Sequence, residues 1–257
     1  MQRLWAWLFF PWMACAATNP PSPPRVISLP VPANNAVFFE TQRAGVPNLT
    51  SLKAVVALPE GFDARKAWPV LLVTASSGAS AVQAWNAYTN VGLAEGWIVV
   101  AVDGPKVAVE RDTYTYSRAM ISALFEQLRR SWPQSKNWPV ACAGFSGGGK
   151  RAAMTAADLV KRGDKVIGVF MGGCNRDRAT DGYYVSQPGA AFLNLPFFFS
   201  NGLNDPIAGP ERGAEAKQSM EQAGFRQVRL EVYPGGHRLD TNHLRMALQW
   251  FQGRERK

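Results

Sequence analysis

The chain has 257 residues, of which 47% are hydrophobic, and this suits one large globular domain with a buried core rather than a disordered chain. Its formal net charge is +9, but the basic residues are scattered along the sequence. Nucleic-acid-binding proteins usually show denser basic clusters with interleaved aromatic side chains, so we expect no nucleic-acid partner and interpret the charge as a solvated basic surface.

Residues 1–17 have the pattern of a signal peptide. A short positive start precedes an apolar run from Leu4 to Met13, and Ala14-Cys15-Ala16 has the A-x-A form of a signal-peptidase site. The apolar run is too short for a membrane span. We therefore expect a secreted or periplasmic protein, cleaved after residue 16 or 17. The alternative is a lipoprotein anchored at Cys15.

The folded domain is expected over residues 35–257, after a proline-rich linker at 18–34. Its first elements are predicted to be two antiparallel edge strands, Ala36–Thr41 and Leu52–Leu58.

Strands and helices then alternate to the end of the chain. Short apolar runs predict strands at 69–74, 97–102, 139–144, 166–171, 195–200 and 228–233. Amphipathic or small-residue segments predict helices at 82–94, 113–131, 147–161, 211–223 and 240–251. This alternation indicates an α/β fold with a mostly parallel sheet of about eight strands and helices on both faces. Residues 172–194 lack a long periodic apolar stretch, so no large cap domain is expected.

Two cysteines, Cys142 and Cys174, follow the predicted signal peptide. Their offset along neighbouring strands exceeds the reach of a disulfide, so we expect two free thiols that are buried or half-buried.

The sharpest motif is Gly144-Phe145-Ser146-Gly147-Gly148, between a predicted strand and a predicted helix. A serine at the apex of such a turn has a strained backbone, and glycines two positions before and after it avoid a collision of Cβ atoms. The following helix directs free N–H groups at negative charge forming beside the serine. The pattern predicts a nucleophile elbow; a glycine-rich turn of an ordinary α/β protein is the alternative.

Two later strand ends supply groups that match a nucleophilic serine. His237 follows the last predicted strand and is the candidate base, while His243 lies in the first turn of the last helix. Asp205 follows the preceding strand and is the candidate acid that orients the base. Its rivals by residue type are Asp103, Asp177 and Asp181.

An oxyanion hole requires two convergent N–H donors. We expect one from Gly147 and the other from Ser77 or Ser76, in the loop after the strand at 69–74. This chemistry needs no cofactor. With two histidines and no cluster of ligands, the sequence indicates no metal site.

Over about residues 36–252 the chain resembles the α/β-hydrolase superfamily, through the Gly144–Gly148 elbow and the order Ser146, Asp205, His237. More loosely, Leu58–Phe62 leading into the strand at 69 resembles secreted esterases related to polyhydroxybutyrate depolymerases and feruloyl esterases. The resemblance implies a secreted serine hydrolase that cleaves carboxylic esters through an acyl-enzyme. The alternatives are a serine peptidase or other acyl hydrolase with the same triad, and a non-catalytic hydrolase-like binding module.

Without a cap, the expected site is shallow and open, which suits bulky or polymer-linked esters. Trp85, Phe145 and Tyr116 are the predicted substrate-binding side chains. Further candidates for the rim are Tyr114, Tyr183 and Tyr184. The alternative for these aromatic side chains is packing against the core.

Overall fold

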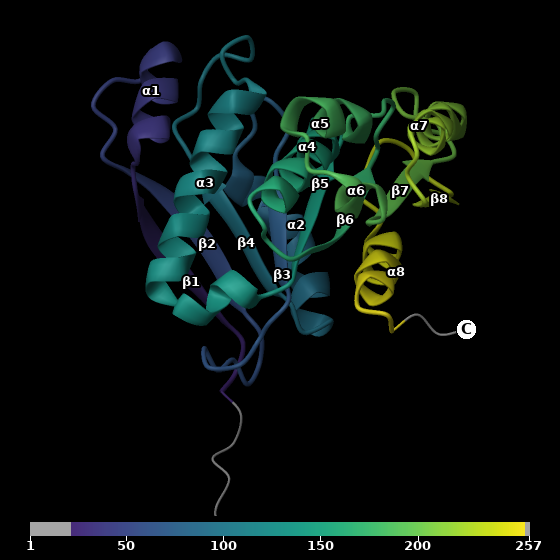
Figure 1. The fold of residues 1–257 in the computed structure, drawn as a ribbon. Helices are drawn as coiled ribbons and strands as arrows, with labels where there is room; N and C mark the ends of the chain where they lie inside the picture. Colours follow the sequence, from purple (N-terminus) through teal and green to yellow (C-terminus); the bar gives the residue numbers. More distant parts are fainter. Residues whose placement is uncertain (1–21, 255–257) are drawn as a thin grey trace, which may run out of the picture.

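The computed structural model describes residues 22–254, so the predicted signal peptide and Cys15 lie outside the described residues. The strands are β1 (Arg25–Pro32), β2 (Ser51–Leu58), β3 (Val70–Thr74), β4 (Ile98–Asp103), β5 (Val140–Phe145), β6 (Val166–Gly172), β7 (Pro196–Gly202) and β8 (Gln227–Tyr233). They form one sheet of eight strands in the order β1-β2-β4-β3-β5-β6-β7-β8. All neighbours from β4 to β8 are parallel, whereas β1 and β2 pair antiparallel at one edge (Figure 1). The predicted sheet is confirmed.

Helices cover both faces of the sheet. They are α1 (Asn35–Arg43), α2 (Ala81–Ala94), α3 (Tyr114–Ser131), α4 (Gly147–Lys161), α5 (Ala179–Ser186), α6 (Ala190–Leu193), α7 (Pro210–Gln222) and α8 (Thr241–Phe251), with a short 3-10 helix at Pro133–Asn137. The helices α2 and α8 pack on one face, and α3, α4 and α7 pack on the other (Figure 1).

Alternating side chains of each central strand enter two separate cores. In β3, for example, Val70 and Leu72 belong to the core beneath α3 and α4, while Leu71 and Val73 face α2. This is the two-residue period of a strand buried on both faces, and it explains why such strands read as continuous apolar runs. Cys142 and Cys174 are both buried and free, as predicted.

The N-terminal elements differ from the prediction. Residues 25–32 of the predicted linker form β1, an edge strand of the sheet. Ile27, Leu29 and Val31 face the core, whereas Pro30 and Pro32 are exposed. Proline is tolerated there because the edge needs no outward N–H donor. The predicted strand 36–41 is wrong: these residues belong to α1, whose N-cap Asn34 accepts a hydrogen bond from the Val37 N–H (3.0 Å).

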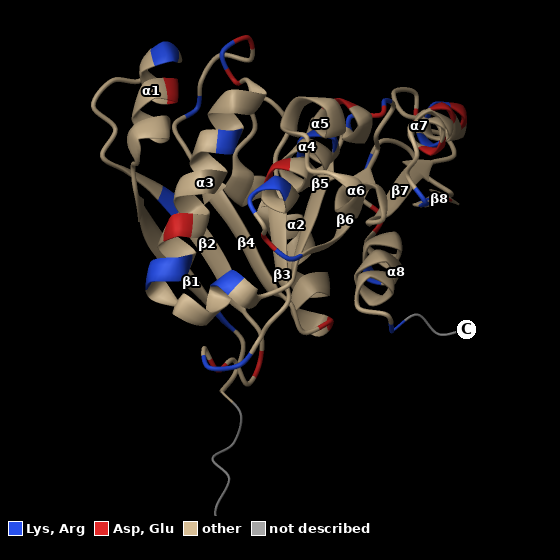
Figure 2. Ribbon diagram, viewed as in Figure 1, with Lys and Arg blue, Asp and Glu red and all other residues tan. Residues whose placement is uncertain are grey.

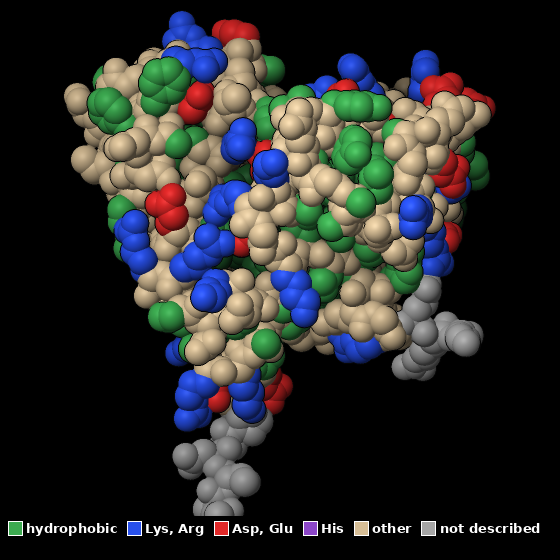
Figure 3. Space-filling model, viewed as in Figure 1, with side chains coloured by type: hydrophobic (Ala, Val, Ile, Leu, Met, Phe, Trp, Pro, Cys, Tyr) green, Lys and Arg blue, Asp and Glu red, His purple; other side chains and the backbone are tan. Residues whose placement is uncertain are grey.

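Only the short helices α5 and α6 separate β6 from β7, so no large cap is present in the described chain. Apolar side chains gather over α5 in Figure 3, where Tyr184 is 67% and Val185 65% exposed. Lysine and arginine are spread over many elements, interspersed with acidic residues (Figure 2). Within residues 22–254, no helix is both long and apolar enough to cross a membrane.

Candidate active site

Ser146 occupies a sharp turn between β5 and α4. Its φ of 56° and ψ of −122° lie outside the usual regions for an L-residue, and it is the N-cap of α4. Two backbone hydrogen bonds stabilise this strained conformation. The Ser146 N–H donates to the Gly172 carbonyl (2.7 Å), and the Ser146 carbonyl accepts from the Lys150 N–H (3.3 Å). The backbone therefore has the geometry predicted for an elbow.

Two glycines are required by the close approach of strand and helix at this turn. A Cβ on Gly144 would lie 2.2 Å from the backbone carbon of Gly148, and a Cβ on Gly148 would lie 2.4 Å from the Thr74 carbonyl oxygen. Real Cβ atoms do not approach backbone so closely, so neither position accepts a side chain without moving β3, β5 or α4.

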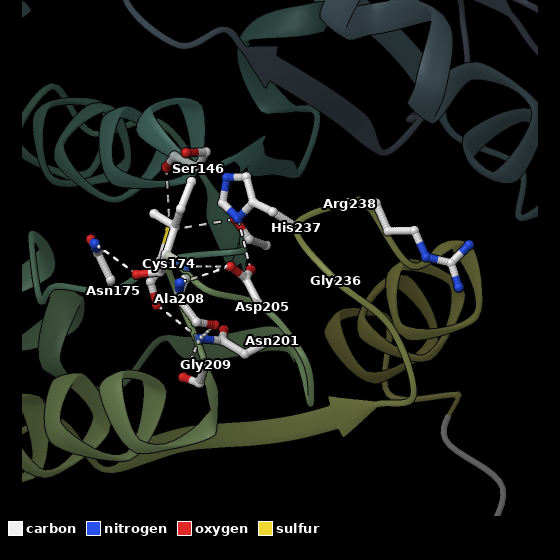
Figure 4. A network of polar contacts seen from close by, with 12 residues as sticks. Ser146, Cys174, Asn175, Asn201, Asp205, Ala208, Gly209, Gly236, His237 and Arg238 are labelled. Carbon is white, nitrogen blue, oxygen red and sulfur yellow. Dashed lines mark hydrogen bonds and ion pairs between the residues drawn. The ribbon is translucent and has the colours of Figure 1, made fainter.

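His237 and Asp205 meet beside this turn. The His237 Nδ1 and Asp205 Oδ2 atoms are 2.7 Å apart. The His237 ring also packs on Phe145, with 4.7 Å between ring centroids, directly next to Ser146. Figure 4 shows the His237 ring between Asp205 and Ser146. The structure thus brings together the three residues predicted from separate strand ends.

The surroundings of Asp205 keep its buried carboxylate ionised. Burial alone would raise the pKa of Asp205, but hydrogen bonds from the Ala208 N–H, His237 and the Ile207 N–H outweigh burial and hold that pKa below its ordinary value. An ionised carboxylate can only accept, so Nδ1 of His237 carries the hydrogen of their shared bond. When the ring carries one proton, Nε2 is therefore the acceptor.

Direct backbone contacts between two loops set this geometry. The N–H of Leu203 donates to the Tyr233 carbonyl (2.8 Å), and the N–H of Asn204 donates to the Gly235 carbonyl (2.9 Å). A Cβ on Gly202 would lie 2.4 Å from the Gly235 oxygen, which explains the glycine at the end of β7. The acid loop and the base loop are therefore joined directly by backbone hydrogen bonds.

The loop after β3 lies against the elbow on its other side. Ser76 Oγ donates to the Phe145 carbonyl (3.1 Å) and accepts from the Gly148 N–H (3.2 Å), so this side chain ties the two turns together. Across residues 22–254, no hydrogen bond involves the backbone N–H of Ser76, Ser77 or Gly147. These are the donors that the sequence predicts for an oxyanion hole, and they remain available.

An arginine and an aspartate, neither predicted from the sequence, hold this loop in place. Asp112 accepts hydrogen bonds from the Gly78 N–H (2.6 Å) and from Arg151 (2.9 Å). Arg151 also donates to Ser77 Oγ (2.6 Å). We call Asp112 and Arg151 the loop clamp. No local sequence signal identifies it, because its contacts join positions 34 and 74 residues apart.

The rival candidates are engaged elsewhere. His243 Nδ1 lies 3.0 Å from Ser200 Oγ, and the His243 ring packs on Phe198 and Tyr233 in the first turn of α8. The rival carboxylates have structural partners. Asp103 accepts from Ser80 and the Ala81 N–H, Asp177 from Ser219 and the Thr180 N–H, and Asp181 from Arg178.

Two of the predicted aromatic side chains are buried in the core. Trp85 is 5% exposed and donates to the Val99 carbonyl, and Tyr116 is 6% exposed and donates to the Pro105 carbonyl. Placing these two side chains at the site was wrong, because both point inward from their helices. Phe145 does lie at the site, against His237. Among residues 22–254, no three His, Cys, Asp or Glu side chains are grouped to hold a metal ion.

Comparisons with known proteins identify the architecture. No protein-family model matches the sequence, and no curated protein matches it. Solved structures do match. The S-formylglutathione hydrolase of Staphylococcus aureus is 15% identical, with a TM-score of 0.60 over 90% of this chain and 99% of that one. A bacterial heroin esterase is 18% identical, with a TM-score of 0.61 over 91% and 85%. The dienelactone hydrolase of Anabaena variabilis is 17% identical, with a TM-score of 0.58 over 91% and 99%.

Proposed function

Because this chain has the α/β-hydrolase fold, we propose that it is a serine hydrolase that cleaves carboxylic esters. The observation that carries the proposal is the 2.7 Å hydrogen bond between His237 Nδ1 and Asp205, beside the positive-φ turn at Ser146. The esterase and hydrolase names of the matched structures agree with it.

The proposed reaction follows from the roles these groups are suited to. Ser146 Oγ attacks the ester carbonyl carbon and its proton passes to His237 Nε2. The oxyanion accepts hydrogen bonds from the N–H of Gly147 and from Ser77 or Ser76. Collapse of the intermediate expels the alcohol, which takes the proton from His237. Water, deprotonated by His237, then attacks the acyl carbonyl carbon. The bond to Ser146 Oγ breaks, the acid leaves and His237 returns the proton to Ser146.

A panel of aryl and alkyl esters, with peptides included, tests this function. We expect ester turnover that falls to background in Ser146→Ala, since this change removes the proposed nucleophile. Hydrolysis of peptides but not esters would favour the serine peptidase instead. Full turnover by Ser146→Ala would overturn the mechanism. The absence of a cap in residues 22–254 also suits bulky esters, and a marked preference for small soluble esters would count against that part.

The two histidines provide a matched pair for the base. His237→Ala should abolish turnover, because the proton of Ser146 then has no acceptor. His243→Ala should retain it, since His243 contacts Ser200 rather than the elbow. The reverse result would show that the base is misassigned.

Export is the remaining part of the proposal and rests on the pattern of residues 1–17. Mass spectrometry of the mature protein should find an N-terminus at residue 17 or 18. A lipid-modified Cys15 would instead identify a lipoprotein, and a retained residue 1 would exclude both.

A further inference from the structure

A pocket of about 300 Å³ opens beside the proposed oxyanion donors. Its walls come from the loop after β3, the first two turns of α4, the start of α3 and the loop after β6. The side chains and backbone that matter here are Ser77, Gly147, Lys150, Arg151, Arg176 and Arg178. Because Ser77 and Gly147 line it, the pocket adjoins the position proposed for the ester carbonyl oxygen.

Positive charge dominates the lining. Four cationic side chains line the pocket, and Asp112 is its one carboxylate. Arg151 already pairs with Asp112, and Arg178 pairs with Asp181 at 2.5 Å. Within residues 22–254, neither the Lys150 nor the Arg176 side chain forms an ion pair or a side-chain hydrogen bond. Two cations are thus left without a counter-ion.

The backbone of α4 adds to the positive electrostatic potential in the pocket. Gly147 is the first residue of α4, so the positive end of the helix dipole points into the pocket. Lys150 lies in the first turn of that helix, where a cation is unfavourable unless an anion is nearby. The one hydroxyl hydrogen of Tyr114 is shared between Asp158 and the Met154 carbonyl (2.9 Å), so it is not available to a bound ligand.

We propose that this pocket binds a carboxylate carried by the ester substrate, with Lys150 and Arg176 as its counter-ions. The inference rests on the proposed function and narrows it to anionic esters. Arg151 remains committed to the loop clamp, so the specificity comes from the two unpaired cations. At a partly exposed site, dissolved ions screen the attraction between opposite charges. The preference for anionic over neutral esters should therefore decrease as the salt concentration rises.

Matched esters measure the preference. The first pair is an aryl hemisuccinate and its methyl-capped neutral analogue, with the charge on the acyl side. The second pair is a butyrate ester of hydroxybenzoic acid and the corresponding benzamide, with the charge on the alcohol side. Wild-type protein should show a higher kcat/KM for the anionic member of at least one pair. That ratio should decline as NaCl rises from roughly 0.02 M to roughly 0.5 M.

Charge-matched variants locate the effect. Lys150→Gln with Arg176→Gln should lower the ratio about tenfold, the size expected for two partly exposed charge contacts. Lys161→Gln with Lys165→Gln removes the same charge from exposed positions at and just beyond the far end of α4 and should leave the ratio unchanged. Thermal unfolding of each variant checks that it is folded.

The outcomes separate the two proposals. If Ser146→Ala abolishes hydrolysis of all four esters but wild type shows no anionic preference, the ester hydrolase stands and the carboxylate pocket is overturned. A preference that survives the Lys150 and Arg176 substitutions, or falls equally in the control, also overturns it. Unchanged hydrolysis by Ser146→Ala would overturn the proposed function itself.

Discussion

Asp205 is the residue whose surroundings are most specialised. Its side chain is fully buried, and its two oxygens accept from two backbone N–H groups and from His237. A carboxylate with these donors holds the His237 ring in one orientation and one tautomer. The mechanism therefore depends on the charge of Asp205 as well as on its shape.

Replacing Asp205 with asparagine should separate these two properties. The amide has nearly the same shape, but its NH₂ group can donate to Nδ1 and favour the wrong tautomer. We expect kcat for a neutral ester to fall by about 10⁴-fold, the loss that this change causes in serine proteases with a Ser-His-Asp triad. Asp177→Asn is the control, because Asp177 is also a buried loop carboxylate but binds Ser219. A loss within tenfold for Asp205→Asn, or equal losses in both variants, would contradict the assigned role.

The same carboxylate links stability to pH. Because the pKa of Asp205 is lowered on folding, its ionised form stabilises the fold above the ordinary pKa, and this stabilisation is lost as pH falls through the folded-state pKa. The difference in unfolding free energy between wild type and Asp205→Asn should be largest near neutral pH and shrink below about pH 4. Denaturant titrations at several pH values measure it. A difference that grows toward acid pH would show that the pKa is raised instead.

At the scale of the elements, the loop after β3 depends on the loop clamp. Arg151 bridges Ser77 and Asp112 with the two arms of its guanidinium group, which lysine cannot do with one ammonium. Arg151→Lys should leave the loop loosely held and the oxyanion donors misplaced. For a neutral ester we expect kcat to fall about tenfold with little change in KM, since the lost contacts act mainly on the transition state.

Arg118→Lys is the matched control for this change. Arg118 forms an ion pair with Asp158 (2.9 Å) but does not touch the loop, so its substitution should leave kcat within twofold, roughly, of wild type. Equal effects of the two substitutions, or an Arg151→Lys effect confined to KM, would show that the clamp does not position the donors.

The elements show which structural features the sequence could predict. The strands from β3 to β7 are short apolar runs buried on both faces, and such runs predict strands directly. The strand predicted at 36–41 failed because the cap at Asn34 and the side-chain bond from Thr41 to the Val37 carbonyl stabilise a helix there. Alternation of Ile27, Leu29 and Val31 was a readable signal for β1, but the surrounding prolines suggested a linker.

At the candidate site too, some residues could be predicted from the sequence and others could not. Ser146, Asp205 and His237 could be located because each follows a strand, and parallel strands end on one edge of the sheet. The loop clamp could not, because it depends on side chains that meet only after folding, 34 and 74 residues apart in the chain. Trp85 and Tyr116 are buried because of the way their helices face the sheet. The residue type alone could not predict this, since aromatic side chains occur both around binding sites and in cores.

For the whole molecule, β1 closes the edge of the sheet outside β2 and covers part of the core beside α3. A chain starting at residue 22 keeps β1, whereas one starting at residue 35, the predicted domain boundary, loses it. The shorter chain exposes the backbone of β2 and leaves the contacts of Ile27, Leu29 and Val31 unmade. At about 1–2 kcal/mol for each side chain, we expect a Tm lower by about 10 °C. Equal Tm values for the two chains would show that β1 is dispensable.

Activation of Ser146 by His237 is the step on which the proposed hydrolase depends. Its most direct measurement is the intact mass of the folded protein after exposure to a fluorophosphonate, which phosphonylates an activated serine. We predict one adduct on Ser146, absent from Ser146→Ala and formed at least about 100-fold more slowly by His237→Ala. No adduct on the folded wild-type protein, or the same adduct on Ser146→Ala, would contradict the claim.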